Sequence, residues 1–431
     1  MDQTVWNTIN GRIFQTSNDS GQIISRLAGH ADFVLILLSP SYLLWSHPKM
    51  LLLIQTLVLG IGGVFVFLIA KEILKNKNFA LLFGFLFLVN PLPQFTNLYD
   101  FHPVSLATTF LLASFYFLIK RKYLLLTFFL ILSGLTKEQV WAVVLFFGFP
   151  LLIQKTKKIK FLGAGIIFFS LIIFWYLIWH AIPQKAGGVH FALSYFSDFG
   201  DSPTEVVKNF FISPQKIAST IFEGHRLDYL RQIFMPLGFL SLLSPLYLIF
   251  AIPDLLINLL SNNTQLHQIY YQYTSTITPF IFISSIFAVK KITKWFPKLP
   301  KTYIIIYLFL FSLYCAYSYG PLPYANKPNT DMLTKLQSNG KAIEDFLSKI
   351  PEKYTVAATN NLGSHVSHRQ RVFTVPLGIG KADFVIFLLN PDSTSSLSEE
   401  IKMSDNLRSD KNYTEVYSKD HFVVFKKRNL L

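Results

Sequence analysis

Cysteine and charged residues are both scarce in this 431-residue chain. The single cysteine excludes a disulfide-stabilised scaffold and a cysteine-based metal cluster. Charged residues make up only 15% of the sequence, whereas a soluble domain carries about 25%. Hydrophobic residues make up 52%, and 43 of them are phenylalanines. These proportions exclude an ordinary soluble enzyme.

The two signs of charge are distributed unevenly along the chain. The formal net charge is +15, which in a soluble protein would indicate a nucleic-acid partner. Residues 331–431 carry 14 Lys/Arg and 12 Asp/Glu, whereas residues 1–330 carry 25 and 12. A turn-rich stretch at 320–329 (GPLPYANKPN) separates the two parts. We therefore predict a membrane domain over 1–320 and a soluble α/β domain over 321–431.

Apolar runs dominate the first part. A membrane-spanning helix needs about 20 mostly apolar residues, and a water-soluble fold could not bury so many runs of this kind. We predict a mostly α, polytopic α-helical membrane protein with a small C-terminal α/β domain. The predicted spans are 48–70, 79–98, 103–119, 123–136, 139–153, 159–182, 234–260, 270–289 and 303–320. The spans 123–136 and 139–153 are short and need tilt or neighbouring helices to cross.

Basic clusters predict the orientation of these spans. Fifteen Lys/Arg residues fall in four alternate connections, at 71–77, 120–122, 155–160 and 290–301. Such connections are cytoplasmic by the positive-inside rule, and most acidic residues of the membrane domain lie in the opposite loops. The basic excess therefore indicates a multi-pass cell (plasma) membrane protein and no nucleic-acid partner.

The segment 234–260 does not fit this alternation as a single span. We expect it to enter and return, turning near Pro245 or Pro253, which leaves the C-terminal domain extracytoplasmic. The alternative is one crossing, which puts that domain in the cytoplasm. The orientation also places the polar N-terminus outside without a preceding apolar helix, so we expect a first helix to be missing from the chain as given.

The C-terminal part has the pattern of a small mixed domain. Residues 331–349 have helical periodicity, and short β-like runs follow at 354–359, 371–375, 382–389 and 421–426. It contains no phosphate-binding loop, metal-ligand spacing or Ser-His-Asp order. His365 and His368 are interpreted as surface histidines. The pattern favours a binding or packing module.

Polar residues in the short outer loops are the candidates for chemistry. Glu138 follows Lys137, and Asp100 lies two residues before His102, each pair within a short link between apolar runs. A carboxylate beside a cation stays ionised, which suits contact with a hydroxyl, a metal or a positive partner. His30 and His102 have no second His or Cys at coordinating spacing, so we assign no metal ligands, although a divalent metal remains an option.

Several stretches together resemble a known family. They are DQTVWNTINGRIF, LAGHADFVLILLSPSYLL, NLYDFHPVSLATTFLLASF, LTKEQV, QYTSTITPF and, in the C-terminal part, NNLGSHVSHRQRVFTVP. In this order they resemble the predicted bacterial and archaeal integral membrane proteins called domain of unknown function 2079. That family is similar in layout to the GT-C glycosyltransferases, which use polyprenyl-phosphate-linked sugars as donors.

The GT-C resemblance implies roles for particular acids. In those enzymes a carboxylate in the first outer loop is the catalytic base, and another acid often lies in a later outer loop. It implies Asp2 and Asp100 for these positions, and Glu138 is a third catalytic candidate. The family pattern also includes a Phe-Asp-Leu-Gly-like segment that would precede residue 1. An Asp there would make Asp2 a supporting group.

Glycosyl transfer from a lipid phosphate needs a base for the acceptor hydroxyl and cations for the leaving phosphate. The loop 183–233 is a candidate lid or acceptor-binding segment. The expected partners are a polyprenyl-phosphate-linked sugar and membrane lipid, with the oligomeric state left open. The predicted substrate-binding residues are Arg12, His30, His102, Lys137, Gln272, Tyr273, Arg226 and Arg231.

Two other functions remain open from the sequence. A lipid or small-solute transporter (or flippase) would place charges at mid-membrane, and Asp254 and Asn258 would qualify if 234–260 crosses once. A non-catalytic anchoring protein would use its C-terminal domain to bind a partner.

Overall fold

The protein is described by a computed structural model that covers residues 1–334, 337, 339–389 and 397–428. The chain forms two compact units. We call Met1–Ala28, Leu35–Leu51 and Asp331–Leu431 the terminal unit, and Gly29–Val34 with Leu52–Thr330 the helical unit. The division near residue 330 lies close to the predicted domain boundary. Sequence analysis did not anticipate that the N-terminal segments would pack with the C-terminal part.

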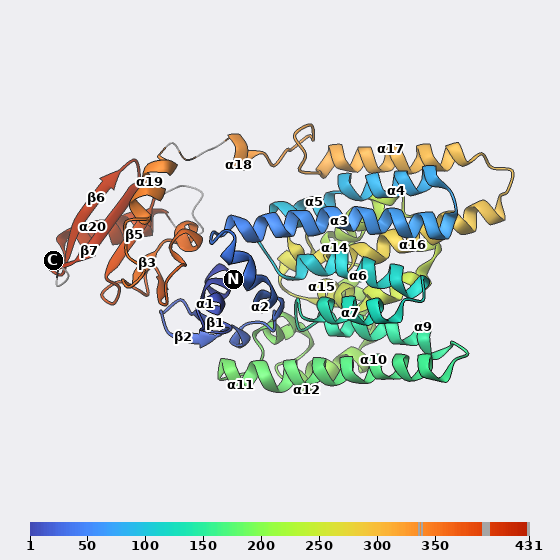
Figure 1. Ribbon diagram of the computed structural model, residues 1–431, viewed down its shortest axis with the longest axis horizontal. Coiled ribbons are helices and arrows are strands. Elements are labelled where there is room, and N and C mark those ends of the chain that lie inside the picture. The colour runs from blue at the N-terminus through green and yellow to red at the C-terminus, as the bar shows by residue number, and fades with distance from the viewer. Residues whose placement is uncertain (335–336, 338, 390–396, 429–431) are drawn as a thin grey trace. The chain divides into compact units, whose positions relative to one another are not determined.

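The helical unit is built from long apolar helices and shorter polar ones. The long helices run alongside one another (Figure 1). Its helices are α3 (Lys49–Leu74, beginning in the terminal unit), α4 (Lys77–Val89), α5 (Pro91–Leu98), α6 (Val104–Ile119), α7 (Tyr123–Gly134), α8 (Val140–Val144), α9 (Phe149–Leu152), α10 (Lys157–Tyr176), α11 (Ile182–Ala186), α12 (Pro203–Ile212), α13 (Pro214–Ile221), α14 (Gly224–Phe234), α15 (Ile252–Leu260), α16 (Thr278–Trp295) and α17 (Lys301–Tyr319).

Among the described residues, three helical stretches are long and apolar enough to cross a membrane: Lys49–Leu74, Lys157–Ala186 and Lys301–Tyr319. The pair α4 and α5, bent by 40°, adds a fourth if it counts as one span. The predicted spans at 103–119, 123–136, 139–153 and 234–260 contain shorter apolar helices. Proline contributes to this shortening, because Pro91 and Pro150 lack the N–H that would continue the preceding helix.

Glycine allows the closest helix contacts in this unit. A Cβ added to Gly62 in α3 would lie 2.8 Å from the Thr109 side chain, and one added to Gly148 would lie 2.5 Å from the backbone oxygen of Gly163 in α10. Small residues let apolar helices approach at backbone distance, which is how helices associate within a membrane.

The basic connections lie at one end of the helical unit. Figure 1 shows the α3–α4, α9–α10 and α16–α17 connections at the same end. Lys120, after α6, is 3.2 Å from Glu72 near the end of α3, which brings the α6–α7 connection to this end too. The 16-residue helix α6 is about 24 Å long. The loops at the other ends of these helices therefore lie roughly one membrane core away from the basic clusters.

The segment 234–260 is not one helix. After α14 it continues as short 3₁₀ helices, η6 (Met235–Leu237), η7 (Leu240–Leu243) and η8 (Pro245–Ala251), before α15. Left-handed backbone at Gly238 and Phe239 separates η6 from η7. The two flanks of the segment meet, because the His225 and His267 rings are 4.8 Å apart. The segment therefore returns to the end where it began, and Pro245, a predicted turn, begins η8.

The terminal unit contains a small mixed sheet. Strands β3 (Val356–Ala358), β4 (Val372–Thr374), β5 (Phe384–Leu388), β6 (Tyr413–Lys419) and β7 (Phe422–Lys427) lie in the order β4-β3-β5-β7-β6. The β3 strand pairs parallel with β4 and β5, and β7 pairs antiparallel with β5 and β6. Buried apolar side chains of β3 and β5 form a core on each face. The four predicted β-like runs contain β3, β4, β5 and β7.

Shorter elements complete this unit. The predicted helix 331–349 contains two helices rather than one, and α20 and β6 were not predicted. The elements are α1 (Asp2–Ile9), β1 (Gln15–Ser17), β2 (Ile23–Ser25), α2 (Val34–Leu38, beginning in the helical unit), η2 (Ser39–Leu43), α18 (Asp331–Thr334), α19 (Gly340–Leu347) and α20 (Leu397–Ser409).

Candidate functional site

Glu138 is the centre of a polar cluster in the helical unit. It follows α7 in the short connection to α8, and its side chain is only 2% exposed. Its Oε1 lies 2.8 Å from Nδ1 of His30, and its Oε2 accepts a hydrogen bond from the Ala31 backbone N–H at 3.0 Å. Sequence analysis selected His30 and Glu138 separately, and the fold brings them together.

A second histidine faces the same carboxylate. Nε2 of His190 is 3.6 Å from Oε1 of Glu138, longer than a hydrogen bond. Because Nδ1 of His190 accepts the Ala192 backbone N–H at 3.1 Å, this ring carries its proton on Nε2. Within the described part of the chain, this Nε2 has no hydrogen-bond partner. Phe191 packs against both rings, with centroids 4.9 Å from His190 and 5.1 Å from His30.

The surroundings of Glu138 keep it ionised. Burial by itself would raise the pKa of the carboxyl, but His30, His190 and Lys137 together hold the pKa of Glu138 well below its usual range. A carboxyl group in this state does not act as a general acid near neutral pH. It is instead hydrogen-bonded to Nδ1 of His30 and so fixes the orientation of that ring.

Lys137 supplies a cation beside this pair. Its Nζ lies 5.9 Å from the centre of the Tyr273 ring, and its side chain is half-buried. No carboxylate of the described residues lies within ion-pair distance of it. The Tyr271 ring contacts two other rings, with its centroid 6.2 Å from that of Tyr273 and 5.1 Å from that of Tyr99. A half-buried cation that has no carboxylate within ion-pair distance among the described residues is suited to bind an anion.

His102 and Asp100 lie beside these aromatic rings. His102 stacks on Tyr99 with ring centroids 5.2 Å apart, and its Nδ1 donates to the Asp100 backbone oxygen at 2.9 Å. Burial, reinforced by Lys137, lowers the pKa of His102 to about 4, so the ring is neutral at physiological pH. The Asp100 side chain is exposed.

A buried network supports the connection that carries Glu138. Nε2 of Gln139 donates to Oδ1 of Asp254 at 3.0 Å, and the Thr276 hydroxyl donates to Oδ2. The Asn258 side-chain amide donates to the Tyr273 backbone oxygen at 2.9 Å. Asp254 and Asn258 therefore fix the residues around Lys137 and Tyr273.

The remaining predicted residues of the helical unit lie outside this cluster. Arg226 is buried and donates to Ser261 O at 3.1 Å and to Glu223. Arg231 is exposed and pairs with Asp228 at 3.1 Å. Gln272 is buried next to Tyr273, and its Oε1 has no partner among the described side chains.

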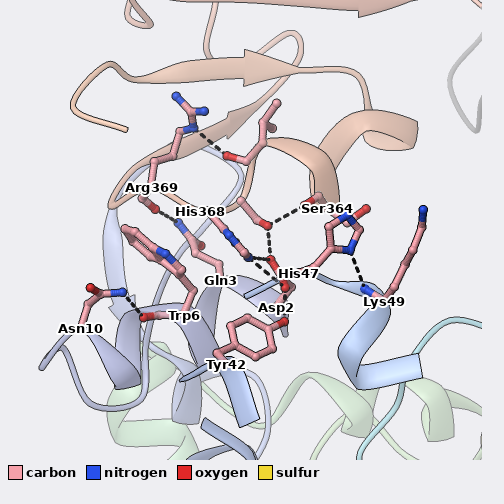
Figure 2. Close-up of polar contacts among 12 residues, drawn as sticks. Asp2, Gln3, Trp6, Asn10, Tyr42, His47, Lys49, Ser364, His368 and Arg369 are labelled. Carbon is pink, nitrogen blue, oxygen red and sulfur yellow. Dashed lines mark hydrogen bonds and ion pairs between the residues drawn. The ribbon is translucent and has the colours of Figure 1, made fainter. Parts of the chain in front are cut away.

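Asp2 belongs to the terminal unit, whereas Glu138 belongs to the helical unit. Figure 2 shows it facing His368 and Tyr42, and its side chain is largely buried. The hydroxyls of Tyr42 and Ser367 donate to it, and Nε2 of His368 is 3.1 Å from its Oδ2. Burial would raise the pKa of Asp2, but these partners lower it below its usual value.

His368 is therefore a structural partner of Asp2, and its interpretation as a surface histidine was wrong. It also stacks on Trp6 at 5.9 Å. Arg12 lies in the same unit, where its Nε donates to Oδ1 of Asn7 at 2.8 Å and its guanidinium lies 4.9 Å from the centre of the Trp6 ring.

Comparison with known proteins identifies the family. The model of the family described as "Predicted membrane protein (DUF2079)" matches residues 1–424. The chain belongs to this family. The family predicted from the sequence motifs is thereby confirmed for nearly the whole chain. A comparison with curated proteins gives no match.

The DUF2079 chain is also similar to a solved structure, the Archaeoglobus fulgidus oligosaccharyltransferase tethered with an acceptor peptide. The two sequences are 14% identical, with a TM-score of 0.44. The similarity covers 90% of this chain and 64% of the archaeal chain, so this chain spans less than two thirds of that protein.

The DUF2079 chain contains site residues that the motifs did not indicate. His190 lies near the start of the 183–233 loop, with no local pattern that marks it. Among the described residues, no group of three or more His, Cys, Asp or Glu side chains is arranged to hold a metal ion. The arrangement that the fold does build is a carboxylate–imidazole pair, a cation and a row of aromatic rings.

Proposed function

We propose that this protein is a membrane glycosyltransferase that moves a sugar from a polyprenyl-phosphate donor to an acceptor hydroxyl on the outer face of the membrane. The observation that carries the proposal is the pair of buried Glu138 and half-buried His30, joined at 2.8 Å, with the half-buried cation of Lys137 next to it. A base and a cation at one end of an apolar bundle match the needs of lipid-phosphate chemistry.

The reaction uses His30 as the general base. Its Nε2 takes the proton of the acceptor hydroxyl while the hydroxyl oxygen bonds to the anomeric carbon of the donor sugar. The bond from that carbon to the phosphate oxygen breaks at the same time, and polyprenyl phosphate leaves with the electron pair. Glu138 stabilises the imidazolium of His30 that forms, because it remains an anion.

Lys137 stabilises the charge that develops on the leaving phosphate. Tyr273, beneath its ammonium group, and neutral His102 provide ring faces for a sugar. Asp100, exposed next to His102, is a second carboxylate for the acceptor. In this proposal Asp2 has a supporting role, because its oxygens accept hydrogen bonds within the terminal unit.

An apolar groove in the same unit supports a lipid-linked donor. It has a volume of about 690 Å³ and its lining includes Phe146, Phe149 and Phe250. Phe146 lies between α8 and α9, and Phe149 begins α9, so both follow Glu138 along the chain. A prenyl chain whose phosphate contacts Lys137 would reach this groove.

The orientation is supported by two features. The Glu138 cluster lies at the helix ends opposite the basic connections, which the positive-inside rule makes cytoplasmic. The N-terminal segment and the C-terminal domain share the terminal unit, which requires an even number of crossings between them. The eight predicted spans other than 234–260 meet that requirement if each crosses once. Together with cytoplasmic basic connections, an even number of crossings supports the proposal that both ends of the chain are extracytoplasmic.

Transport is less consistent with this geometry. A transporter would use Asp254 and Asn258 at mid-membrane, but the flanks of 234–260 meet and Asn258 contacts Tyr273 near the helix ends. Uptake into vesicles without any acceptor would favour transport over transfer.

The test is transfer in liposomes that contain the purified full chain. Radiolabelled polyprenyl-phosphate monosaccharides are supplied with a panel of acceptors, and wild type is compared with Glu138→Ala and His30→Ala. Glu72→Ala serves as the matched control, because Glu72 is a carboxylate at the opposite end of the unit. We expect transfer by wild type and the control only. Full activity of both site variants contradicts the proposal.

A further inference from the structure

A second polar pocket lies in the helical unit, between α14 and the 3₁₀ helix η9 (Thr264–His267). Its volume is about 300 Å³. His267 and Tyr229 are its buried residues, at 5% and 1% exposure. Gln232 and Gln268 contribute carboxamides, and the exposed ring of Tyr270 lies at its rim. The described lining consists of side chains that carry hydrogen-bonding groups, which disfavours an apolar ligand.

His267 presents an acceptor in this pocket that the fold leaves unused. Its Nδ1 is 3.3 Å from the Asn258 backbone oxygen. A carbonyl oxygen only accepts, so the ring proton is on Nδ1 and Nε2 has the lone pair. Burial lowers the pKa of His267, which keeps the ring neutral. Its Nε2 is buried and has no hydrogen-bond partner among the described residues. Buried polar atoms in native proteins normally have a partner, so a ligand donor is expected here.

We propose that this pocket binds a hexose, which is the acceptor saccharide of the transfer reaction. A sugar hydroxyl donates to Nε2 of His267, and the Gln232 and Gln268 carboxamides can each donate and accept. The exposed face of Tyr270 packs on the apolar face of the sugar ring. A simple anion fits this pocket less well, because His267 Nε2 offers a lone pair rather than a proton and because the Asp228 carboxylate is part of the lining.

The pocket is connected to the Glu138 cluster by one residue. The Asn258 side-chain amide donates to the Tyr229 hydroxyl at 2.9 Å and to the Tyr273 backbone oxygen at 2.9 Å. Tyr273 in turn lies under Lys137. The assignment as an acceptor site rests on the proposed function, whereas hexose binding does not.

Saturation-transfer difference NMR on the purified full chain in detergent tests the binding. The probes are D-glucose, D-galactose, D-mannose and N-acetyl-D-glucosamine. We expect at least one to bind, and His267→Phe to weaken its affinity about tenfold or more. Gln268→Leu changes a partly exposed side chain, so it provides a second variant if the His267 variant does not fold. His180→Phe is the matched control, because His180 is exposed and outside the pocket lining.

The outcomes separate this inference from the proposed function. Absence of hexose binding to wild type, or equal binding by the Gln268 variant and the control, overturns the pocket. Glu138→Gln is expected to abolish transfer and to retain hexose binding. A third outcome is that hexose binding depends on Gln268 but the wild-type protein shows no transfer activity. That result supports the pocket and overturns both the transfer reaction and the acceptor role. An unchanged acceptor KM in Gln268→Leu overturns the acceptor role alone.

Discussion

Replacing Glu138 by glutamine tests the central pair most directly. The carboxylate accepts hydrogen bonds from two donors, the half-buried His30 ring and the buried Ala31 backbone N–H. A glutamine has one acceptor oxygen and turns an N–H group toward the other partner. The variant therefore loses two hydrogen bonds to a charged acceptor, and it either leaves one donor without a partner or forces the His30 proton onto Nε2, which costs about 1–3 kcal/mol of unfolding free energy. The same change removes the anion that orients His30, so we expect transfer to slow by about 10² to 10⁴.

The effect on stability depends on pH in a defined direction. The pKa of Glu138 is lowered in the folded protein, so its contribution is complete above the unfolded value of about 4.3 and is lost as pH falls through the folded pKa. The glutamine variant has no such group. The stability gap between wild type and variant therefore narrows as pH falls below about 4.3 and through the folded pKa of Glu138.

Thermal unfolding in detergent, followed by tryptophan fluorescence between pH 3 and 7, measures this gap. Glu72→Gln is the control, because Glu72 forms exposed pairs with Lys75 and Lys120 that contribute no more than about 1 kcal/mol. The reasoning is refuted if the Glu138 variant is as stable as the control at pH 7, or if its deficit grows on acidification.

Three further predictions concern the other residues. Lys137→Ala should lower kcat with the polyprenyl-phosphate donor about tenfold or more, because the cation stabilises charge that develops on the leaving phosphate, and steady-state kinetics against the basic-loop control Lys122→Ala will measure this. Asp2→Asn should destabilise the terminal unit by about 1–3 kcal/mol, because one of the hydroxyl groups that donate to Asp2 loses its acceptor. Hydrogen exchange of the backbone amides in β3 and β5 measures this loss of stability. Equal protection in wild type and variant would contradict the prediction. His102, with a pKa of about 4, should stay neutral from pH 5 to 8, and NMR of the histidine rings measures its protonation. Protonation near pH 6.5, the ordinary value for histidine, would show that burial does not lower the pKa of His102.

Local pattern predicted much of the fold. Four β-like runs contained real strands because each alternates or concentrates apolar residues that pack on a core. Strand β6 (YTEVYSK) was missed because it is an edge strand with several exposed polar residues, and its apolar positions are shifted by an irregularity between Glu415 and Tyr417. The distribution of basic residues predicted that the segment 234–260 enters and returns, and the two flanks of the segment do meet. Helical periodicity alone would not have indicated this.

The candidate site was predictable only in part. Glu138 was predicted as a candidate because an acidic residue beside a lysine, in a short connection between two apolar helices, is unusual. Its pairing with His30 could not be predicted, because His30 is 108 residues away, and His190 was missed because it lies in a loop with no periodicity. The same limit applied to Asp2, whose partner His368 is 366 residues distant. Side chains this far apart meet only through tertiary packing, which composition and spacing do not encode.

The contact between the Asp2 carboxylate and the His368 ring also determines when the terminal unit can form during synthesis. Ribosomes add about 5–20 residues per second, so the partners of Asp2 appear on the order of tens of seconds after it. Throughout that time α1 exists without Ser367 and His368, while all the apolar helices between them are made and inserted. The residues of α1 are thus among the last to reach their native contacts, and a chain that stops short of residue 367 would leave the Asp2 carboxylate without two of its partners.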